Sequence, residues 1–255
     1  MNKEKSEDFW IDIRLTEEEI NFLHDAMPVQ KDINENLKYD LAGNISRSEK
    51  LIDKDNWFYE TTLKKLTERM FYRDLDEYHK YYIEKEEPPP KFQLDKLWVN
   101  YMKQHEFNPL HDHSGVFSFV IFVKIPTDWR EQHALSISAT SNSPYASDLQ
   151  FVWPDEDHKQ CVYRNFSLSS EDEGRMLFFP ASLQHQVYPF YECEEERVTI
   201  SGNIQLYEPD KLKFRVEGGL YEKKKNALKM LEVTVEGVKK ELEYLKKQED
   251  KKIGK

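Results

Sequence analysis

Two amphipathic helical stretches precede a β-rich region in the pattern of apolar and polar positions. Residues 9–27 have the pattern of a short strand followed by a helix in which apolar side chains recur three and four residues apart. Thr16 stands where a helix N-cap belongs, and Glu19 three residues later completes a capping box. A second helical stretch, residues 56–85, ends at the Glu-Glu-Pro-Pro-Pro break of residues 86–90. Because proline interrupts helices, the pattern predicts an N-terminal helical layer that ends here.

The region from residue 92 to residue 205 has the pattern of many short strands. Segments rich in β-branched and aromatic residues follow one another, with turn residues between them and no helical pattern. The predicted strands lie in residues 96–104, 114–126, 134–139, 149–154, 174–181, 184–191 and 197–207. Such spacing predicts a mainly β, antiparallel sandwich or jelly roll. The long polar stretch within residues 127–170 is interpreted as an insert of the kind that often gates a site.

The C-terminal stretch returns to a helical pattern. Its apolar positions are spaced alternately three and four residues apart, like the seam of a coiled coil, and are Leu228, Leu231, Val235, Val238, Leu242 and Leu245. Two interpretations stay open: self-association through residues 228–245, giving a homo-oligomer, or an amphipathic helix that lies on its own core. The predicted organisation is a helical layer over residues 1–91, a β core over 92–220 and a C-terminal helix over 221–255.

Composition excludes some classes of partner. The chain has 255 residues, with 48 acidic against 37 basic side chains and a formal net charge of −11. This balance argues against general nucleic-acid or membrane-surface binding, because both partners are polyanionic. The two cysteines fit no zinc or redox spacing, and no apolar run suits a signal peptide or a membrane span. We therefore expect a protein of the cytoplasm.

A pair of histidines offers candidate metal ligands. His111 and His113 flank Asp112 in a segment that precedes an apolar strand. Alternate side chains of a strand share a face, so the two imidazoles are expected to point the same way and Asp112 the other. Two imidazoles so placed suit a transition metal. The H-x-H pattern alone is only moderately specific, since histidines also cluster by chance.

A second segment strengthens the metal interpretation. An apolar strand breaks at Pro180 and delivers His185 near its end, and Arg197 and Thr199 follow on what is predicted to be one strand face. A buried arginine needs a carboxylate partner. A guanidinium beside a hydroxyl can bind a carboxylate through several hydrogen bonds.

Three motifs follow one another in the order H-x-H, a distal histidine after Phe-Phe-Pro, and R-x-T. This order resembles the Fe(II)/2-oxoglutarate-dependent oxygenase superfamily, and within it the H-x-H oxygenases common in marine bacteriophages. If a phage encodes the protein, we expect it in the host cytoplasm. The resemblance covers residues 98–206, extends upstream through residues 41–46 and does not include the C-terminal seam. It implies a double-stranded β-helix of the jelly-roll or cupin-like kind, with Fe(II), 2-oxoglutarate and O2 as cofactor and co-substrates. By the same resemblance, His111 and His185 are iron ligands.

The resemblance also implies a co-substrate site. Arg197 corresponds to the residue that pairs with the distal carboxylate of 2-oxoglutarate, and Thr199 to a hydrogen-bonding neighbour. Asn100 and Tyr101 lie on the strand before the histidine pair, where related prolyl hydroxylases have a tyrosine that binds the co-substrate. We therefore expect these four residues to surround 2-oxoglutarate.

The chain departs from the superfamily pattern at one position. The usual motif is H-x-D, and His113 stands where the aspartate is expected. His113 itself, Asp112 after a local bulge, or no nearby residue at all could fill the third ligand position. Neutral nitrogen ligands leave Fe(II) one negative charge short of a 2-His-1-carboxylate site, which should weaken its binding.

Three functions fit these motifs. The first is an oxygenase, by default a hydroxylase, that couples decarboxylation of 2-oxoglutarate to succinate with oxidation of a protein, nucleobase, lipid or small-molecule substrate. The second is a cupin-like three-His iron dioxygenase without 2-oxoglutarate, which leaves Arg197 unexplained. The third is a non-catalytic metal-binding β-sandwich that assembles through the C-terminal seam.

Overall fold

The computed structural model describes four stretches of the chain, which are residues 10–27, 41–71, 90–155 and 159–207. The chain divides into two units, Met1–Tyr207 and Glu208–Lys255. The whole second unit, and with it the predicted seam at 228–245, lies outside the described residues. Among the residues that are described, no helix has the length and apolar character needed to cross a membrane.

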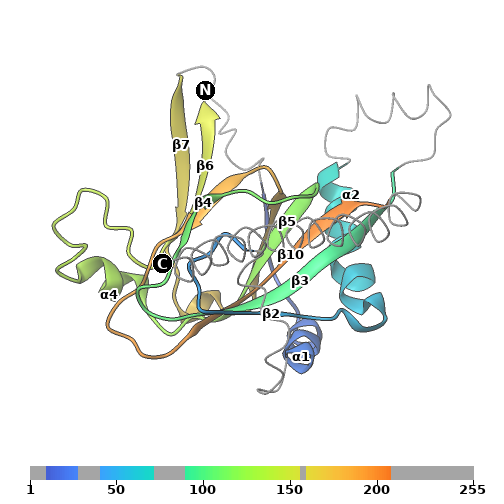
Figure 1. Ribbon diagram of the computed structural model, residues 1–255, viewed down its shortest axis with the longest axis horizontal. Coiled ribbons are helices and arrows are strands. Elements are labelled where there is room, and N and C mark those ends of the chain that lie inside the picture. The colour runs from blue at the N-terminus through green and yellow to red at the C-terminus, as the bar shows by residue number, and fades with distance from the viewer. Residues whose placement is uncertain (1–9, 28–40, 72–89, 156–158, 208–255) are drawn as a thin grey trace, which may run out of the picture. The chain divides into compact units, whose positions relative to one another are not determined.

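Ten strands and several short helices make up the described part of the first unit (Figure 1). In chain order they are β1 (Ile11–Arg14), α1 (Glu17–Ala26), β2 (Arg47–Lys50), η4 (Lys54–Asn56), η5 (Tyr59–Leu63), α2 (Lys64–Phe71), β3 (Phe92–Met102), β4 (Asn108–His111), β5 (Phe117–Lys124), α4 (Trp129–Ala134), β6 (Leu149–Asp155), β7 (Gln160–Phe166), η6 (Ser170–Asp172), β8 (Arg175–Pro180), β9 (Gln184–Val187) and β10 (Arg197–Leu206).

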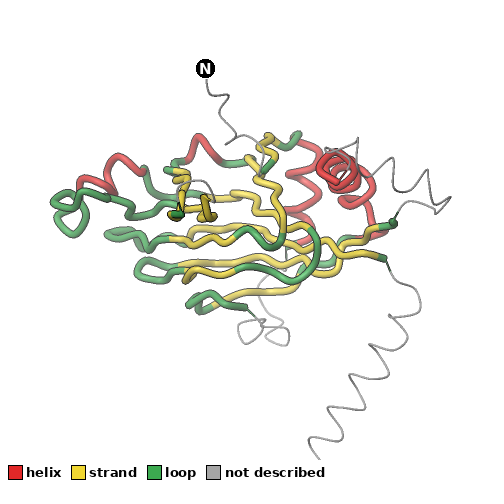
Figure 2. Tube along the Cα trace, turned by 90° about the horizontal axis from the view of Figure 1, so that it is seen from above, coloured by secondary structure: helices red, strands yellow, loops and turns green. Residues whose placement is uncertain are grey.

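The strands form two antiparallel sheets with the connectivity of a double-stranded β-helix. One sheet has the order β1-β8-β5-β10-β3-β2 and the other the order β4-β9-β6-β7. From β3 to β10 the chain passes back and forth between the two sheets, with only β6 and β7 following each other in the same sheet. Figure 2 shows the strands in the middle of the described part and helical segments at its borders. The predicted fold class, mainly β with N-terminal helices, is confirmed.

Strand alternation gives the six-stranded sheet two different faces. On the paired strands β3 and β10, Val99 and Ile200 lie opposite each other and enter the core that α1, η5 and α2 cover. Their neighbours Trp98 and Ser201 point instead toward the second sheet and line a cavity. A second apolar cluster, which includes Phe151 of the four-stranded sheet, fills the rest of the space between the sheets. The polar side chains that interrupt the apolar pattern of β3 and β10 therefore face the cavity.

The N-terminal region contributes strands as well as helices. The capping box is present as predicted: Thr16 Oγ1 accepts from the backbone of Glu19 at 3.3 Å, and the Glu19 carboxylate accepts from the backbone of Thr16 at 2.7 Å. The strand before α1 is β1, which pairs with β8, while β2 pairs with β3. The N-terminal region thus also extends both edges of the larger sheet.

Two predicted features of the middle region are wrong. Residues 134–139 form the end of α4 and a series of turns, because the backbone amides of Ser138 and Ala139 both bond to the carbonyl of Leu135. The alternating serines of this segment mimic a strand pattern, yet serine also favours such local turns. Residues 127–170 are not an insert as a whole, since β6 and β7 lie within them and complete the second sheet. In the described part of this range, the α4 connection before β6 is the long segment that lies outside the strands.

Candidate metal centre

A cavity of about 240 Å³ opens between the two sheets. Residues of β3, β5 and β10 line one side, and β4 and β9 line the other. Residues 41–43 and Ile45 border the cavity. Two hydrogen bonds from backbone amides fix this part of the chain: Asn44 N donates to Phe107 O at 2.8 Å, and Ser46 N donates to the Glu106 carboxylate at 2.9 Å. Glu106 therefore has a structural role in shaping the cavity wall.

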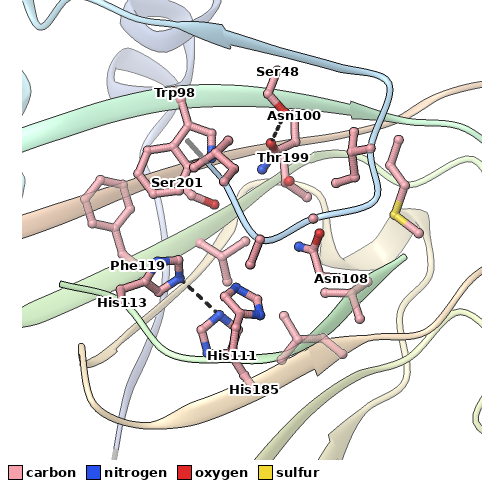
Figure 3. A pocket seen from close by; sticks show the side chains of 18 of the residues that line it. Ser48, Trp98, Asn100, Asn108, His111, His113, Phe119, His185, Thr199 and Ser201 are labelled. Atoms are coloured by element: carbon pink, nitrogen blue, oxygen red, sulfur yellow. Dashed lines mark hydrogen bonds between the residues drawn. The ribbon is translucent and has the colours of Figure 1, made fainter. Parts of the chain in front are cut away.

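Three histidines converge in this cavity (Figure 3). His111 ends β4 and lies directly opposite His185 of β9, while His113 follows two residues after His111. One ring nitrogen of each residue lies within 4.8 Å of the other two. The Nε2 atoms of His113 and His185 are 3.1 Å apart. Two nitrogen ligands at right angles on a metal, with bonds of about 2.1 Å, lie about 3.0 Å apart. The spacing therefore suits neighbouring positions on one metal ion.

Backbone carbonyls orient two of the rings. The Nδ1 atom of His111 lies 2.7 Å from the carbonyl oxygen of Pro109, and Nδ1 of His185 lies 3.0 Å from that of Leu183. A carbonyl oxygen can only accept, so each Nδ1 carries the hydrogen and each Nε2 keeps a lone pair. This is the tautomer that a metal ligand needs.

Burial keeps two of the rings neutral. It lowers the pKa of His185 to about 3, with the neighbouring histidines adding to the effect, and the pKa of His113 to about 4, with a further contribution from His111. A neutral imidazole is the form that binds a metal, so His113 and His185 do not have to lose a proton at neutral pH.

The structure distinguishes His113 from Asp112. Asp112 is exposed and does not belong to the convergent group, although it borders the cavity. Strand alternation was expected to turn His111 and His113 the same way, but β4 ends at His111, so the two histidines do not share a strand. His113 is held instead by its backbone amide, which donates to Ala181 O at 2.9 Å. This contact fixes the backbone of His113 beside Ala181, and its ring converges with the other two.

Arg197 is buried at the start of β10, with 2% of its surface exposed, and borders the same cavity. Its Nη2 donates to Ser147 Oγ, and its guanidinium lies 5.2 Å from the ring centre of Phe190. Nε and Nη1 are buried without a hydrogen-bond partner. Burial lowers the pKa of Arg197 to about 10, against the opposing effect of Asp148, so the side chain is still cationic at neutral pH. A buried cation with spare donors suits an anionic ligand.

The two residues expected on β3 go to opposite sides. Asn100 pairs with Thr199 across the sheet, accepts from Ser48 Oγ at 2.7 Å and lines the cavity together with Thr199 (Figure 3). Tyr101 is not among the cavity-lining residues; it packs on the outer core, with the guanidinium of Arg47 3.5 Å from its ring centre. The expected contact between Tyr101 and the co-substrate is therefore wrong, because neighbouring residues of a strand face opposite ways.

Sequence reasoning missed two polar residues of this region. Asn108 lines the cavity near His111, and its Oδ1 atom is buried without a partner (Figure 3). Its position on the same short strand as His111 was an available signal. Ser147 contacts Arg197 from 50 residues away, and no spacing in the sequence connects them.

Comparisons with known proteins bear on this region. Residues 96–203 match the model of a family described as "Putative 2OG-Fe(II) oxygenase". The matched stretch holds all three histidines, Arg197 and Thr199. It does not include residues 41–46, to which the resemblance was expected to extend. A comparison with curated proteins found no match.

Solved structures similar to this chain are distant. A viral collagen prolyl hydroxylase from Paramecium bursaria chlorella virus 1, in complex with 2-oxoglutarate, is 12% identical, covers 79% of this chain and 98% of its own, and gives a TM-score of 0.39. A 2OG-Fe(II) oxygenase family oxidoreductase from Burkholderia pseudomallei is 11% identical, with coverages of 78% and 85% and a TM-score of 0.46. A Pseudomonas putida prolyl-4-hydroxylase is 9% identical, with coverages of 78% and 94% and a TM-score of 0.42. These likenesses are too distant to bear on the chemistry of this chain.

The family match coincides with the part of the chain that brings the histidines and Arg197 into one cavity. By this match the chain is an oxidoreductase of the Fe(II)- and 2-oxoglutarate-dependent oxygenase type, whose cofactor and co-substrates are Fe(II), 2-oxoglutarate and O2.

Proposed function

We propose that the protein is a hydroxylase that holds Fe(II) through His111, His113 and His185 and binds 2-oxoglutarate between the metal and Arg197. The observation that carries this proposal is the joint presence, in one cavity, of three convergent imidazoles and a buried arginine with unpartnered donors. Either feature alone has ordinary structural explanations. Together they match the two requirements of a 2-oxoglutarate enzyme.

The donor set fits a catalytic iron. His111, His113 and His185 would hold Fe(II) with one ring nitrogen each. With 2-oxoglutarate and O2, the bound iron would supply the oxidising chemistry, and Arg197 would pair with the distal carboxylate of the 2-oxo acid. Because all three protein ligands are neutral, the site should bind Fe(II) more weakly than a site with one carboxylate ligand.

The cavity also fits the co-substrate. Arg197 offers donors to the distal carboxylate, and Thr199 and Asn100 add polar groups on the same side. When bound, Fe(II) and 2-oxoglutarate supply the oxidising chemistry, in which 2-oxoglutarate and O2 yield succinate and CO2 as the substrate gains an oxygen atom. The protein residues orient the 2-oxo acid and keep the reaction in an enclosed space.

The two alternatives explain less of the cavity. A three-His dioxygenase without 2-oxoglutarate has no use for a buried cation, and Arg197 would then remain with two unpartnered donors. A non-catalytic metal protein would likewise leave the buried Arg197 cation and its unpartnered donors without a purpose.

Purified protein with Fe(II), ascorbate and O2 is expected to convert 2-oxoglutarate to succinate, even slowly and without added substrate. The measurement is succinate by mass spectrometry, with the wild type and a His185→Ala variant compared at equal concentration. Succinate from the wild type alone is the expected result. Equal succinate from both proteins would mean that the histidine cluster does not carry the reaction.

A further inference from the structure

The turn before β6 contacts the guanidinium of Arg197. Ser147 is fully buried there, and its hydroxyl accepts the Nη2 hydrogen of Arg197. The backbone amide of Ser147 donates to Pro189 O at 2.9 Å, and the hydroxyl of Thr127 lies 3.3 Å from that of Ser147. Side chain and backbone of Ser147 are therefore both fixed, and its hydroxyl is the one side-chain hydrogen-bond partner that the described residues give Arg197.

Ser147 adopts a backbone conformation that a serine rarely takes. Its φ is +75°, in the left-handed region, where residues other than glycine, asparagine and aspartate are disfavoured. Such conformations persist only where the surroundings enforce them, and they are concentrated at functional sites. A glycine would satisfy the backbone at lower cost but would provide no hydroxyl. The chain thus has a strained residue at the point where a hydroxyl meets Arg197.

The next residue anchors this turn from several sides. The carboxylate of Asp148 is fully buried and accepts from His133 Nε2 at 3.0 Å, from Ser167 Oγ at 3.2 Å and from Asn165 Nδ2 at 3.3 Å. These donors come from α4, from the segment after β7 and from β7 itself. Hydrogen bonds to a buried carboxylate are among the stronger ones in proteins. They fix the position of the turn relative to both elements.

Asp148 also creates a competition for Arg197. Its negative charge lies close enough to act on the Arg197 guanidinium, and a long, flexible side chain could turn toward it and pair directly. Such a pair would take the cation away from a ligand in the cavity. The bond from Nη2 to Ser147 fixes the guanidinium in an orientation that leaves Nε and Nη1 unpartnered.

We infer that Ser147 is a positioning residue for 2-oxoglutarate: its hydroxyl holds the Arg197 guanidinium in the orientation that receives the distal carboxylate, on a turn that Asp148 anchors. The inference rests on the proposed function. It assigns the α4 connection, residues 127–148, a role in preparing the co-substrate site. Ser147 itself touches neither the metal cluster nor the reacting atoms.

The test is a Ser147→Gly variant of the full-length protein, because glycine removes the hydroxyl and accepts the positive φ. Binding of 2-oxoglutarate and of pyruvate to the anaerobic Fe(II) protein is measured by calorimetry. Pyruvate has the same 2-oxo acid group but lacks the distal carboxylate. The Kd for 2-oxoglutarate is expected to rise about tenfold, as for the loss of one hydrogen bond to a charged group. The Kd for pyruvate should stay at its wild-type value, and neither the affinity for Fe(II) nor the melting temperature should fall.

Ser138→Ala is the matched control, since Ser138 is another buried serine of the same connection, with no contact to Arg197 in the described structure. It should leave both Kd values unchanged. Two results would overturn the inference and leave the proposed function standing. One is equal 2-oxoglutarate affinity in Ser147→Gly and the wild type, and the other is a loss of pyruvate affinity in Ser147→Gly as large as the loss of 2-oxoglutarate affinity. A wild-type protein that binds pyruvate and 2-oxoglutarate equally, or neither, would overturn the proposed function itself.

Discussion

Substitution of Arg197 by methionine is expected to weaken 2-oxoglutarate binding by a hundredfold or more while leaving metal binding intact. The distal carboxylate would lose a charge-assisted contact worth about 3 kcal/mol in a buried site. Methionine has a similar length and carries no donors, so it also removes the two buried nitrogens that lack partners. We therefore expect no loss of folding stability, since replacing a poorly paired buried charge by an apolar side chain is often neutral or stabilising. Calorimetric titration and thermal unfolding of the same preparations measure both effects.

Arg197→Lys is the matched control for charge. Lysine keeps the positive charge but loses the planar fork of donors, so its affinity for 2-oxoglutarate should lie between those of the wild type and the methionine variant. Undiminished affinity in Arg197→Met would mean that the buried cation does not bind the co-substrate. A large loss of stability in the methionine variant would instead indicate a structural role for the arginine.

Substitution of His185 by alanine is expected to reduce Fe(II) affinity more than a hundredfold. Loss of an outer partner of a ligand already costs tenfold to a hundredfold in metal affinity, and loss of a ligand should cost more. His185 is the most suitable of the three because it is buried and lies opposite His111, with its Nε2 3.1 Å from that of His113. Anaerobic equilibrium dialysis against Fe(II), followed by metal analysis, measures the affinity.

His105→Asn is the control for removing a histidine. His105 has a φ of +71°, which asparagine tolerates, and it lies outside the convergent group. Parallel variants separate the open assignments of the third ligand: His113→Ala should lose metal, and Asp112→Ala should retain it. Metal loss in Asp112→Ala together with metal binding in His113→Ala would show that Asp112 is the third ligand. Undiminished metal binding in His185→Ala would show that the histidine cluster is not the metal site.

Much of the fold could be predicted because it depends on local patterns. The capping box at Thr16 and Glu19 is a short-range hydrogen-bond pattern, and the structure contains it. The alternation of residues on β3 and β10 determines which side chains face the cavity, as Trp98 and Ser201 do. The same rule correctly put Arg197 and Thr199 on one face. Because Asn100 faces the cavity, the same alternation places its neighbour Tyr101 on the opposite face of β3, away from the cavity.

The remainder depends on contacts that local patterns do not encode. Residues 134–139 have the alternating pattern of a strand and still form turns, because the backbone amides of Ser138 and Ala139 bond to the carbonyl of Leu135 instead of pairing with another strand. The partnership of Ser147 with Arg197 spans 50 residues and arises only when the α4 connection folds against the segment after β9. His113 converges with the other histidines through a loop contact to Ala181.

Several expectations lie beyond the described residues or beyond the comparisons. The seam at 228–245 and the homo-oligomer that it would support fall outside the described part of the chain. The likeness to phage-encoded oxygenases and the cytoplasmic location stay predictions. So do the boundaries of the three predicted regions.

The most direct test of the central claim is the anaerobic addition of 2-oxoglutarate to the Fe(II)-loaded protein, followed by visible absorption. Chelation of iron by the 2-oxo acid gives a weak metal-to-ligand charge-transfer band that neither component has alone. We expect this band to grow to saturation at one 2-oxoglutarate per iron and one iron per chain, and to be absent in His185→Ala. An Fe(II)-loaded wild-type protein without the band at saturating 2-oxoglutarate would contradict it.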